Sequence, residues 1–228
     1  FDFSKAFDSV NHDIILHKLK YLYGIDGTLL KFISNYLKDR TQSVVIGNSK
    51  SCSLPVTSGV PQGSILGPIL FVLFINDISQ GLSIGTEVAL YADDTKIWRA
   101  IHSESDSLAL QNDINYLNEW AANNLMNFHL QKCKVLSVEQ NHHVALSIPR
   151  PLQFSYYLGE RPLEYVSVEN PEKDLGVLMT PNLKWNSQCN RLCTKANQQL
   201  GIVKRNAHFI HDSKRRRALY IAMVRSQF

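Results

Sequence analysis

The sequence lacks several features that would place it in a special class of proteins. Its 228 residues contain no internal repeat, no low-complexity tract and no Ser/Gly linker. With 44% hydrophobic and 19% charged residues it has the composition of a globular chain, which argues against wholesale disorder, collagen or a coiled coil. The four cysteines, Cys52, Cys133, Cys189 and Cys193, are too sparse for a disulfide framework and fit a reducing compartment better.

Long hydrophobic runs and targeting signals are also missing. The longest apolar run, residues 65–75, is about half a membrane span and contains Gly67 and Pro68, so we expect no transmembrane helix and no membrane partner. The chain opens at Phe1 inside an apolar run, without an initiator methionine or a signal peptide. Because both ends look cut, we expect a fragment of a longer protein.

Acidic residues are scarce at one end of the chain. Residues 184–228 carry ten Lys or Arg and one acid, Asp212, for a net charge of +9, whereas residues 1–183 carry −5. An acidic body with a basic tail suggests that a polyanion is held at the tail. A solvated helix face is the alternative, and charge alone favours it.

The hydrophobic pattern predicts strands and helices without strict alternation. We expect helices that begin after Asn11 or Asp13 and after Asp26, and further helices over 64–78, over 105–124 and from about Trp185 onward. Short strands are expected at 1–4, 41–46, 51–56, 88–91, 95–98, 134–138, 144–148 and 175–179. This mixture favours an α+β fold, an antiparallel sheet backed by helices.

Two acidic segments contain the first candidate metal-binding residues. Asp93 and Asp94 are adjacent between two expected strands, and Asp2 lies between Phe1 and Phe3. Neighbouring carboxylates repel each other unless they are solvated or neutralised by a cation, and Mg²⁺ prefers such hard oxygen ligands. If the two strands meet side by side, three carboxylates surround a two-metal site. A solvated turn is the commoner explanation of an isolated Asp-Asp pair.

A third segment, Gly59-Val60-Pro61-Gln62-Gly63-Ser64, precedes the expected apolar helix. Its glycines let the backbone approach a ligand closely, and a helix N-terminus attracts phosphate. In this order the segments resemble the motifs of reverse transcriptases, most closely those of non-LTR (LINE-type) retrotransposons of the Jockey-like group. The matching stretches are 1–8 for the first palm motif, 59–68 for the second, 91–94 for the third, 127–134 for the fourth and 173–177 for the segment that leads to the primer grip. The resemblance runs through nearly the whole chain.

The resemblance implies an RNA-directed DNA polymerase that binds two Mg²⁺ ions through Asp2, Asp93 and Asp94. One ion would lower the pKa of the primer 3′-hydroxyl, and the other would hold the triphosphate and neutralise the leaving pyrophosphate. Lys132 matches the lysine that would donate a proton to the pyrophosphate or screen it. Lys134 is a competing candidate, and a surface lysine is the alternative for both.

The resemblance also implies substrate-binding residues. Phe7 would be the aromatic gate that excludes a 2′-hydroxyl and so selects deoxynucleotides, with a purely structural core Phe as the alternative. Gln62 and Gly63 would lie near the incoming nucleotide and the template base. The partners implied are an RNA template, a DNA primer and dNTPs, and the location implied is the nucleus.

Two regions follow from the same resemblance. Residues 1–183 would form a palm that is incomplete at its N-terminus, and residues 184–228 the basic helical start of the thumb, with the fingers missing. Six basic residues of the thumb would make nonspecific phosphate contacts: Lys204, Arg205, Lys214, Arg215, Arg216 and Arg217. Without the fingers we expect the chain alone to be catalytically incompetent.

The sequence also fits other classes of protein. The chain could be a noncatalytic nucleic-acid-binding remnant of a retroelement, and a group II intron maturase or telomerase-like polymerase is a weaker alternative. Cys189, Cys193, His208 and His211 follow a zinc-finger order, but the spacings are wrong, and helical periodicity explains the cysteines equally well. We therefore predict no zinc site.

Overall fold

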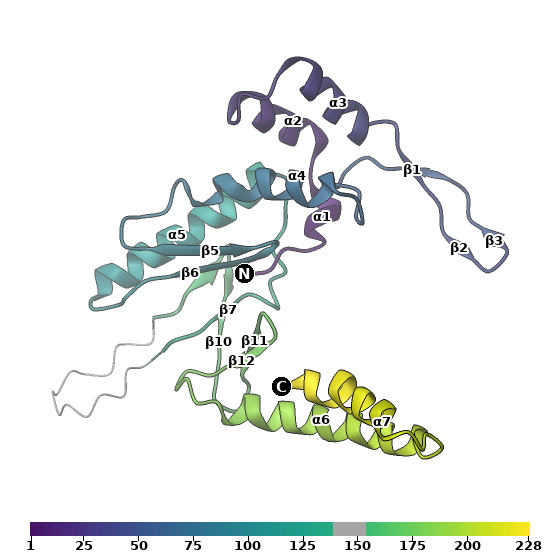
Figure 1. Cartoon of the computed structure of the whole chain (residues 1–228). Helices are drawn as coiled ribbons and strands as arrows, with labels where there is room; N and C mark the ends of the chain where they lie inside the picture. The colour runs from purple at the N-terminus through teal and green to yellow at the C-terminus, as the bar shows by residue number, and fades with distance from the viewer. Residues whose placement is uncertain (139–153) are drawn as a thin grey trace. The chain divides into compact units, whose positions relative to one another are not determined.

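The computed structural model describes residues 1–138 and 154–228 (Figure 1). The strand expected at 144–148 lies outside this range. The chain divides into two compact units. The first comprises Phe1–Lys134 and the described part of 148–164, and the second comprises the described part of 135–147 and Tyr165–Phe228. The chain passes between the units within β7 (Lys134–Val135) and β10 (Glu164–Tyr165), which pair with each other.

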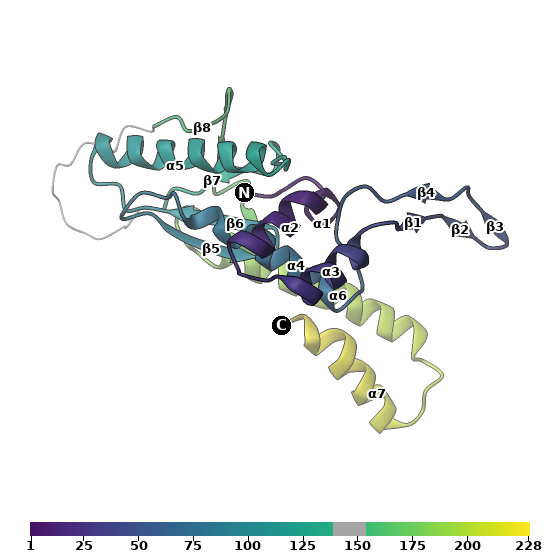
Figure 2. The same ribbon diagram turned by 90° about the horizontal axis from the view of Figure 1, so that it is seen from above.

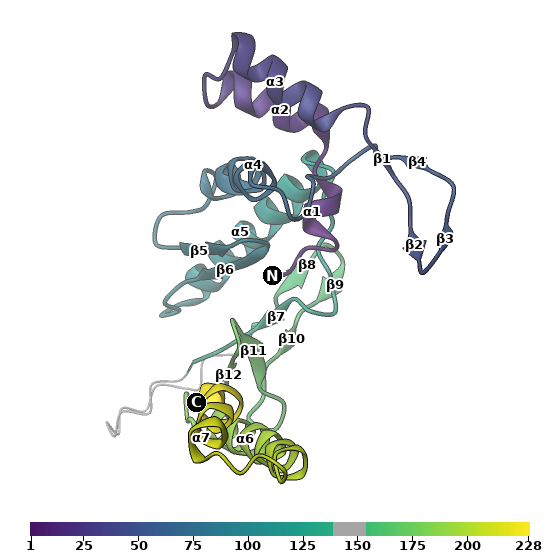
Figure 3. The ribbon, with the colours of Figure 1, turned by 45° about the vertical axis from the view of Figure 1, so that its right-hand side comes forward.

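Two helices of the first unit, α2 (His12–Tyr21) and α3 (Gly27–Leu37), begin at polar caps. The Asn11 side chain accepts hydrogen bonds from two backbone N–H groups at the start of α2, and the Asp26 side chain accepts one at the start of α3. Such caps satisfy N–H groups that have no partner within the helix. The α-helices of this unit are α1 (Ala6–Ser9), α2 (His12–Tyr21), α3 (Gly27–Leu37), α4 (Leu66–Ile75) and α5 (Glu104–Asn123). α2 and α3 pack side by side (Figure 3).

The strands of this unit form short antiparallel pairs. β5 (Glu87–Tyr91) and β6 (Asp94–Trp98) make the longest hairpin. The ribbon between α3 and α4 contains β1 (Thr41–Gln42) paired with β4 (Leu54–Pro55), and β2 (Val45–Ile46) paired with β3 (Ser49–Lys50). The predicted α+β mixture is therefore present, but the expected sheet takes the form of small two-stranded pairs.

A further hairpin, β8 (Tyr157–Leu158) and β9 (Arg161–Pro162), lies against α5 (Figure 2). The amide of Gln111 on α5 acts as a neighbouring strand would. Gln111 Nε2 donates to the Tyr157 carbonyl at 2.8 Å, and the Tyr157 N–H donates to Gln111 Oε1 at 2.8 Å. These bonds satisfy backbone groups of a strand that is only two residues long.

The core of the first unit lies where α2, α4 and α5 meet the segment that follows Phe1. It is formed by fully or almost fully buried apolar side chains, which include Ile15, Leu19, Leu70, Phe71, Phe74, Leu117 and Trp120. α4 is apolar on every side, so part of its surface, including Ile69 and Val72, stays exposed. This core fixes the helices on which the neighbouring strands pack.

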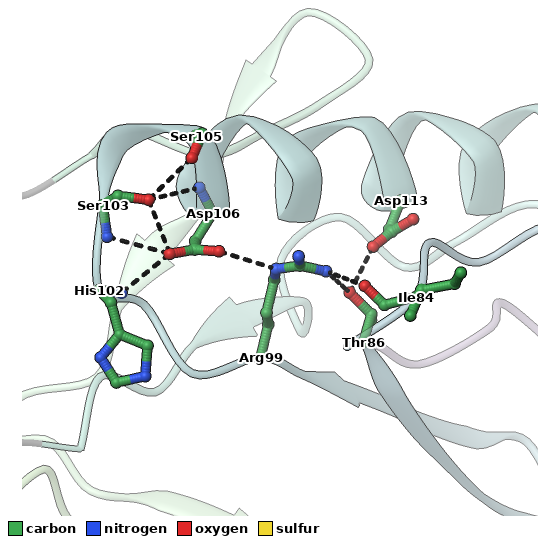
Figure 4. Close-up of polar contacts among 8 residues, drawn as sticks. All are labelled: Ile84, Thr86, Arg99, His102, Ser103, Ser105, Asp106 and Asp113. Atoms are coloured by element: carbon green, nitrogen blue, oxygen red, sulfur yellow. Dashed lines mark hydrogen bonds and ion pairs between the residues drawn. The ribbon is translucent and has the colours of Figure 1, made fainter.

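A polar network attaches the far end of the β5–β6 hairpin to α5 (Figure 4). Arg99 Nη1 donates to the Ile84 carbonyl at 2.9 Å and to Thr86 Oγ1 at 3.1 Å, and its Nε lies 3.6 Å from Asp106 Oδ1. Thr86 Oγ1 donates in turn to Asp113, which is almost completely buried on α5. The hairpin is thereby anchored at the end away from its turn.

The second unit consists of a hairpin and helices. β11 (Glu172–Asp174) and β12 (Val177–Met179) pair around a Leu175–Gly176 turn. Both turn residues have positive φ, 44° and 92°, as the favoured two-residue hairpin turns require. α6 (Asn186–Asn206) and α7 (Ser213–Leu219) follow, and the chain ends in the short helical turns Tyr220–Val224 and Arg225–Gln227.

The strand predicted over 175–179 is therefore wrong in its first half, because Leu175 and Gly176 form the turn. The strand predicted over 134–138 is assigned only for Lys134–Val135. Within the two described stretches, no helix combines the length and the apolar character that crossing a membrane would need.

Candidate active site

The segment that carries Asp2 lies between two other backbone segments. On one side, Phe1 and Thr95 of β6 exchange both backbone hydrogen bonds, at 2.7 and 3.0 Å. On the other side, Phe3 forms an antiparallel bridge with Phe128, and the Asp2 carbonyl accepts a hydrogen bond from the His129 N–H at 2.7 Å. The strands predicted around Asp2 and around the Asp93–Asp94 pair thus meet side by side.

The register of this pairing determines which carboxylates face each other. An exchange of both hydrogen bonds between two residues is the antiparallel pattern, so Asp2, one residue beyond Phe1, lies opposite Asp94. The adjacent Asp93 is the second loop residue of the β5–β6 hairpin. Like charges on directly opposed residues destabilise a strand pair, so this arrangement requires a nearby positive charge.

The hairpin turn places Asp93 through a strained backbone. Ala92, the first of its two loop residues, has φ = 53°, in the left-handed region that favours glycine. A non-glycine residue there costs about 1–2 kcal/mol. Strained residues of this kind are found most often at functional sites.

The positive charge at the carboxylates is Lys132. Its Nζ lies 2.5 Å from Asp2 Oδ2. The hydrogen bond and the charge of Asp2 raise the pKa of the Lys132 ammonium, and the charges of Asp93 and Asp94 add to this effect. All four charged side chains predicted for the catalytic centre are therefore close enough to interact.

The carboxylate oxygens of Asp2, Asp93 and Asp94 are ligands of the kind that Mg²⁺ prefers. They already interact with one cation, the ammonium of Lys132. Within residues 1–138 and 154–228, however, no three His, Cys, Asp or Glu side chains converge closely enough to form a metal-binding group. The Asp2 carboxylate is instead directed toward Lys132.

Buried aromatic side chains pack against one another at the Asp2 segment. Phe3 stacks on Phe128 with ring centroids 4.3 Å apart, and its ring also contacts Trp120 of α5. Cys133 is buried beside the same backbone, and burial raises the pKa of its thiol. This thiol is therefore poorly suited to act as a nucleophile.

Phe7 lies on α1, directly after the Asp2 segment. Its ring is half-buried and stacks on the fully buried Phe71 of α4, with centroids 4.2 Å apart and the planes 19° from parallel. The structure thus gives Phe7 a packing role, while part of its surface stays accessible for the predicted contact with a sugar.

The loop 58–63 lies directly on α1 and brings Gln62 to the same region. The Gly59 N–H donates to the Val10 carbonyl, and the Gly59 carbonyl accepts from His12 Nε2, both at 2.8 Å. Gln62 Nε2 donates to Asp8 Oδ1 at 3.0 Å, and Gly63 is exposed with φ = 78°.

A polar groove of about 690 Å³ opens beside this loop. Its lining includes the basic side chains of Lys5 and Arg40, together with Asp8 and Gln62. The groove is polar and accessible, as a site for a charged ligand should be.

The six predicted phosphate-contacting residues all belong to the second unit and are all exposed. Lys204 and Arg205 lie in the last turn of α6, and the other four lie on α7. The turn of the β11–β12 hairpin is attached to α6, because Arg191 donates to the Gly176 carbonyl and the Leu178 N–H donates to Gln188. The segment predicted to lead to the primer grip and the first basic helix therefore form one structure.

The first unit also contains a buried charged cluster that the sequence pattern does not predict. Lys18 of α2 donates to Asp77 Oδ1 at 2.7 Å and to the Phe74 carbonyl at 2.8 Å, and Trp120 Nε1 donates to the same Asp77 oxygen. Desolvation lowers the pKa of the Lys18 ammonium, and Asp77 opposes this effect. The available signal was a lysine on the same face of α2 as Ile14 and Ile15, but the pattern could not show its partner.

Comparison with known proteins identifies the family. Residues 1–170 match the family described as "Reverse transcriptase (RNA-dependent DNA polymerase)". The chain is 34% identical over 144 residues to the "RNA-directed DNA polymerase from mobile element jockey" of Drosophila melanogaster. The aligned region covers 58% of the chain and 15% of the relative. It is 28% identical over 198 residues to the "Probable RNA-directed DNA polymerase from transposon X-element" of the same species, covering 85% of the chain and 20% of the relative.

A more distant similarity, 32% identity over 77 residues, links the chain to the "Retrovirus-related Pol polyprotein from type-1 retrotransposable element R2" of Popillia japonica, covering 34% of the chain and 12% of the relative. The chain thus spans between about a tenth and a fifth of the length of these relatives. The family match extends over most of the chain and contains the Asp2 segment, the 58–63 loop, the β5–β6 turn and Lys132. The chain belongs to the reverse transcriptase family and is related there to the jockey and X-element enzymes of non-LTR retrotransposons.

Proposed function

We propose that this chain forms the catalytic palm of an RNA-directed DNA polymerase of a non-LTR retrotransposon. The observation that carries the proposal is the pairing of the Asp2 segment with β6, which sets Asp2 opposite Asp94 with Lys132 against Asp2. The reaction is the template-directed transfer of a deoxynucleotide to a primer 3′ end. Its partners are an RNA template, a DNA primer and dNTPs.

In this proposal Asp2, Asp93 and Asp94 hold two Mg²⁺ ions. When bound, the ions would supply the charge that activates the 3′-hydroxyl and stabilises the leaving pyrophosphate. The chain itself positions the carboxylates through the strand pairing and the β5–β6 turn. Lys132 would provide a cation, and a donor of a proton, for the leaving pyrophosphate.

The residues around α1 hold the nucleotide. Phe7 is fixed by its stacking on Phe71, so a sugar that contacts its accessible surface would meet a rigid ring. Gln62 is held beside it by Asp8, and the exposed backbone at Gly63 leaves space for a base. Residues 1–183 act as the palm, and residues 184–228 act as the start of a thumb that contacts the phosphate backbone through six basic side chains.

The test is incorporation of a deoxynucleotide on a primed RNA template, measured for this chain alone and for the chain joined to an N-terminal fingers segment. We expect incorporation by the joined protein that requires Mg²⁺ and falls at least about 100-fold in Asp93→Asn, because one metal ligand is lost. Asp39→Asn is the matched control, since Asp39 is exposed and has φ = 56°, which Asn tolerates.

Incorporation that is unchanged in Asp93→Asn would contradict the proposal. Duplex binding without turnover in the joined protein would instead identify a noncatalytic nucleic-acid-binding remnant. We expect the chain alone to be inactive, and robust extension by it would overturn that expectation without affecting the assignment of the aspartates.

A further inference from the structure

Lys132 belongs to the segment that pairs with Asp2. His129 of this segment donates its N–H to the Asp2 carbonyl, and the His129 carbonyl accepts the N–H of Lys132 at 2.8 Å. The tight turn between them brings the Lys132 ammonium back to the Asp2 carboxylate, 2.5 Å away. The same short stretch of chain therefore contacts both the backbone and the side chain of Asp2.

The ammonium group of Lys132 is subject to the negative charges of three aspartates. It contacts Asp2 directly, and the charges of Asp93 and Asp94 also act on it. A divalent cation held by these carboxylates would need the same negative potential. An ammonium and a dication a few ångströms apart repel each other, so the presence of one weakens the binding of the other to these carboxylates.

We propose that Lys132 competes with the divalent cation for Asp2 and thereby sets the metal affinity of the carboxylate cluster. This inference rests on the proposed function, in which the three aspartates hold metal. The Asp2 side chain is 19% exposed, whereas that of Lys132 is 60% exposed. Lys132 can therefore move into solvent at little cost when a metal ion arrives, while Asp2 stays in place.

The competition has a consequence for the reaction. A weakly held ion favours binding of the metal together with the triphosphate, whose oxygens supply further ligands. Lys132, displaced from Asp2, would be free to screen the charge of the phosphates. The ion pair thus couples binding of the metal to the position of the lysine.

The test measures binding of Mn²⁺, used as the probe, to the protein without nucleotide by electron paramagnetic resonance or calorimetry. We expect Lys132→Gln to lower the Kd for Mn²⁺ about tenfold, because a positive charge beside the site is removed. Lys132→Arg retains the charge and should bind Mn²⁺ within about twofold of the unsubstituted protein. Lys31→Gln, an exposed position on α3, is the matched control for net charge and should leave the Kd unchanged.

The outcomes separate this inference from the proposed function through a fourth variant, Asp93→Asn. If Asp93→Asn abolishes Mn²⁺ binding but Lys132→Gln binds no tighter than the unsubstituted protein, the competition is refuted and the metal site stands. If neither the unsubstituted protein nor Lys132→Gln shows Mn²⁺ binding that Asp93→Asn removes, the assignment of the metal site fails, and the inference fails with it. Equal tightening in Lys132→Gln and Lys31→Gln would attribute the effect to net charge and would also refute the competition.

Discussion

Gly59 marks the closest approach between the 58–63 loop and α1. It has φ = 88°, and a Cβ at this position would lie 2.8 Å from the Cα of Asp8 and 2.9 Å from the Asp8 carbonyl oxygen. Both the backbone conformation and the missing side chain are therefore required. The loop depends on this contact to bring Gln62 to Asp8.

We predict that Gly59→Ala lowers the free energy of unfolding by about 3 kcal/mol, since it adds a left-handed alanine and a backbone clash. The measurement is urea unfolding followed by tryptophan fluorescence. Gly47→Ala is the matched control, because Gly47 has φ = 58° but nothing within 4 Å of the added Cβ. It should cost only about 1 kcal/mol. Equal losses for the two variants would show that the approach to Asp8 contributes nothing.

At the scale of elements, α5 begins at a cap that should make its stability depend on pH. The Asp106 carboxylate accepts hydrogen bonds from Ser103 Oγ and from the backbone N–H groups of His102 and Ser103. These bonds, with that of the Ser103 hydroxyl first, lower the pKa of Asp106 below its ordinary value of 3.8, and the charge of Arg99 contributes to the same shift. In the folded protein the carboxylate is thus favoured over the acid.

The direction of the pH dependence follows from this shift. Because the folded pKa lies below the unfolded pKa, the stabilisation is complete above pH 3.8 and is lost as the pH falls through the folded value. We predict that Asp106→Asn unfolds more easily than the unsubstituted protein at pH 7, and that the difference shrinks well below pH 3.8. Thermal unfolding monitored by circular dichroism across this range is the measurement.

Glu104→Gln serves as the control for Asp106→Asn, because it removes a charge from the same first turn and leaves the hydrogen bonds from Ser103 in place. Its effect at pH 7 should be the smaller of the two. A difference between Asp106→Asn and the unsubstituted protein that stays constant from pH 7 to acid would contradict the role of the carboxylate.

Elements with a local cause could be predicted from the sequence. The starts of α2, predicted after Asn11 or Asp13, and of α3, predicted after Asp26, could be found because a cap involves only the next few residues; Asn11 and Asp26 are the caps. The β5–β6 hairpin could be predicted because its two strands directly flank the acidic turn. The side-by-side placement of the Asp2 segment and β6 is only a condition of the two-metal site in the sequence, and the hydrogen bonds between Phe1 and Thr95 establish it.

Elements with a distant cause could not be predicted. β8 is two residues long and depends on Gln111 of α5, which is 46 positions away in the sequence. Lys18 reads as part of the apolar face of α2, and its partner Asp77 lies on another element. The turn at Leu175 is not predicted by the sequence because leucine rarely takes positive φ, and only the following glycine indicates a turn.

At the scale of the whole molecule, the charge is divided unevenly along the chain. The proposed metal ligands lie in the first compact unit, and the six predicted phosphate-contacting residues lie in the second. On α7 only Asp212, its N-cap, offsets the four consecutive basic residues that follow Ser213. Asp212 lies 3.5 Å from Arg215, an exposed pair of the kind that contributes little to stability.

These exposed charges can contact a nucleic acid. Their contribution to binding can be measured from the dependence of the binding constant on salt concentration. A protein that neutralises phosphates releases counterions, so the logarithm of its binding constant falls with the logarithm of the salt concentration by about 0.9 per phosphate contacted. We predict that replacing Lys214, Arg215, Arg216 and Arg217 by Gln reduces this slope by about 3 on an RNA–DNA duplex. Replacing Lys20, Lys31, Lys38 and Lys50, four exposed lysines of the first unit, by Gln lowers the net charge equally and should change the slope far less. Equal changes would show that only net charge matters, and an unchanged slope in the α7 variant would show that this helix face is merely solvated. A change confined to the α7 variant requires the phosphates to lie at the second unit, where a thumb would hold the duplex.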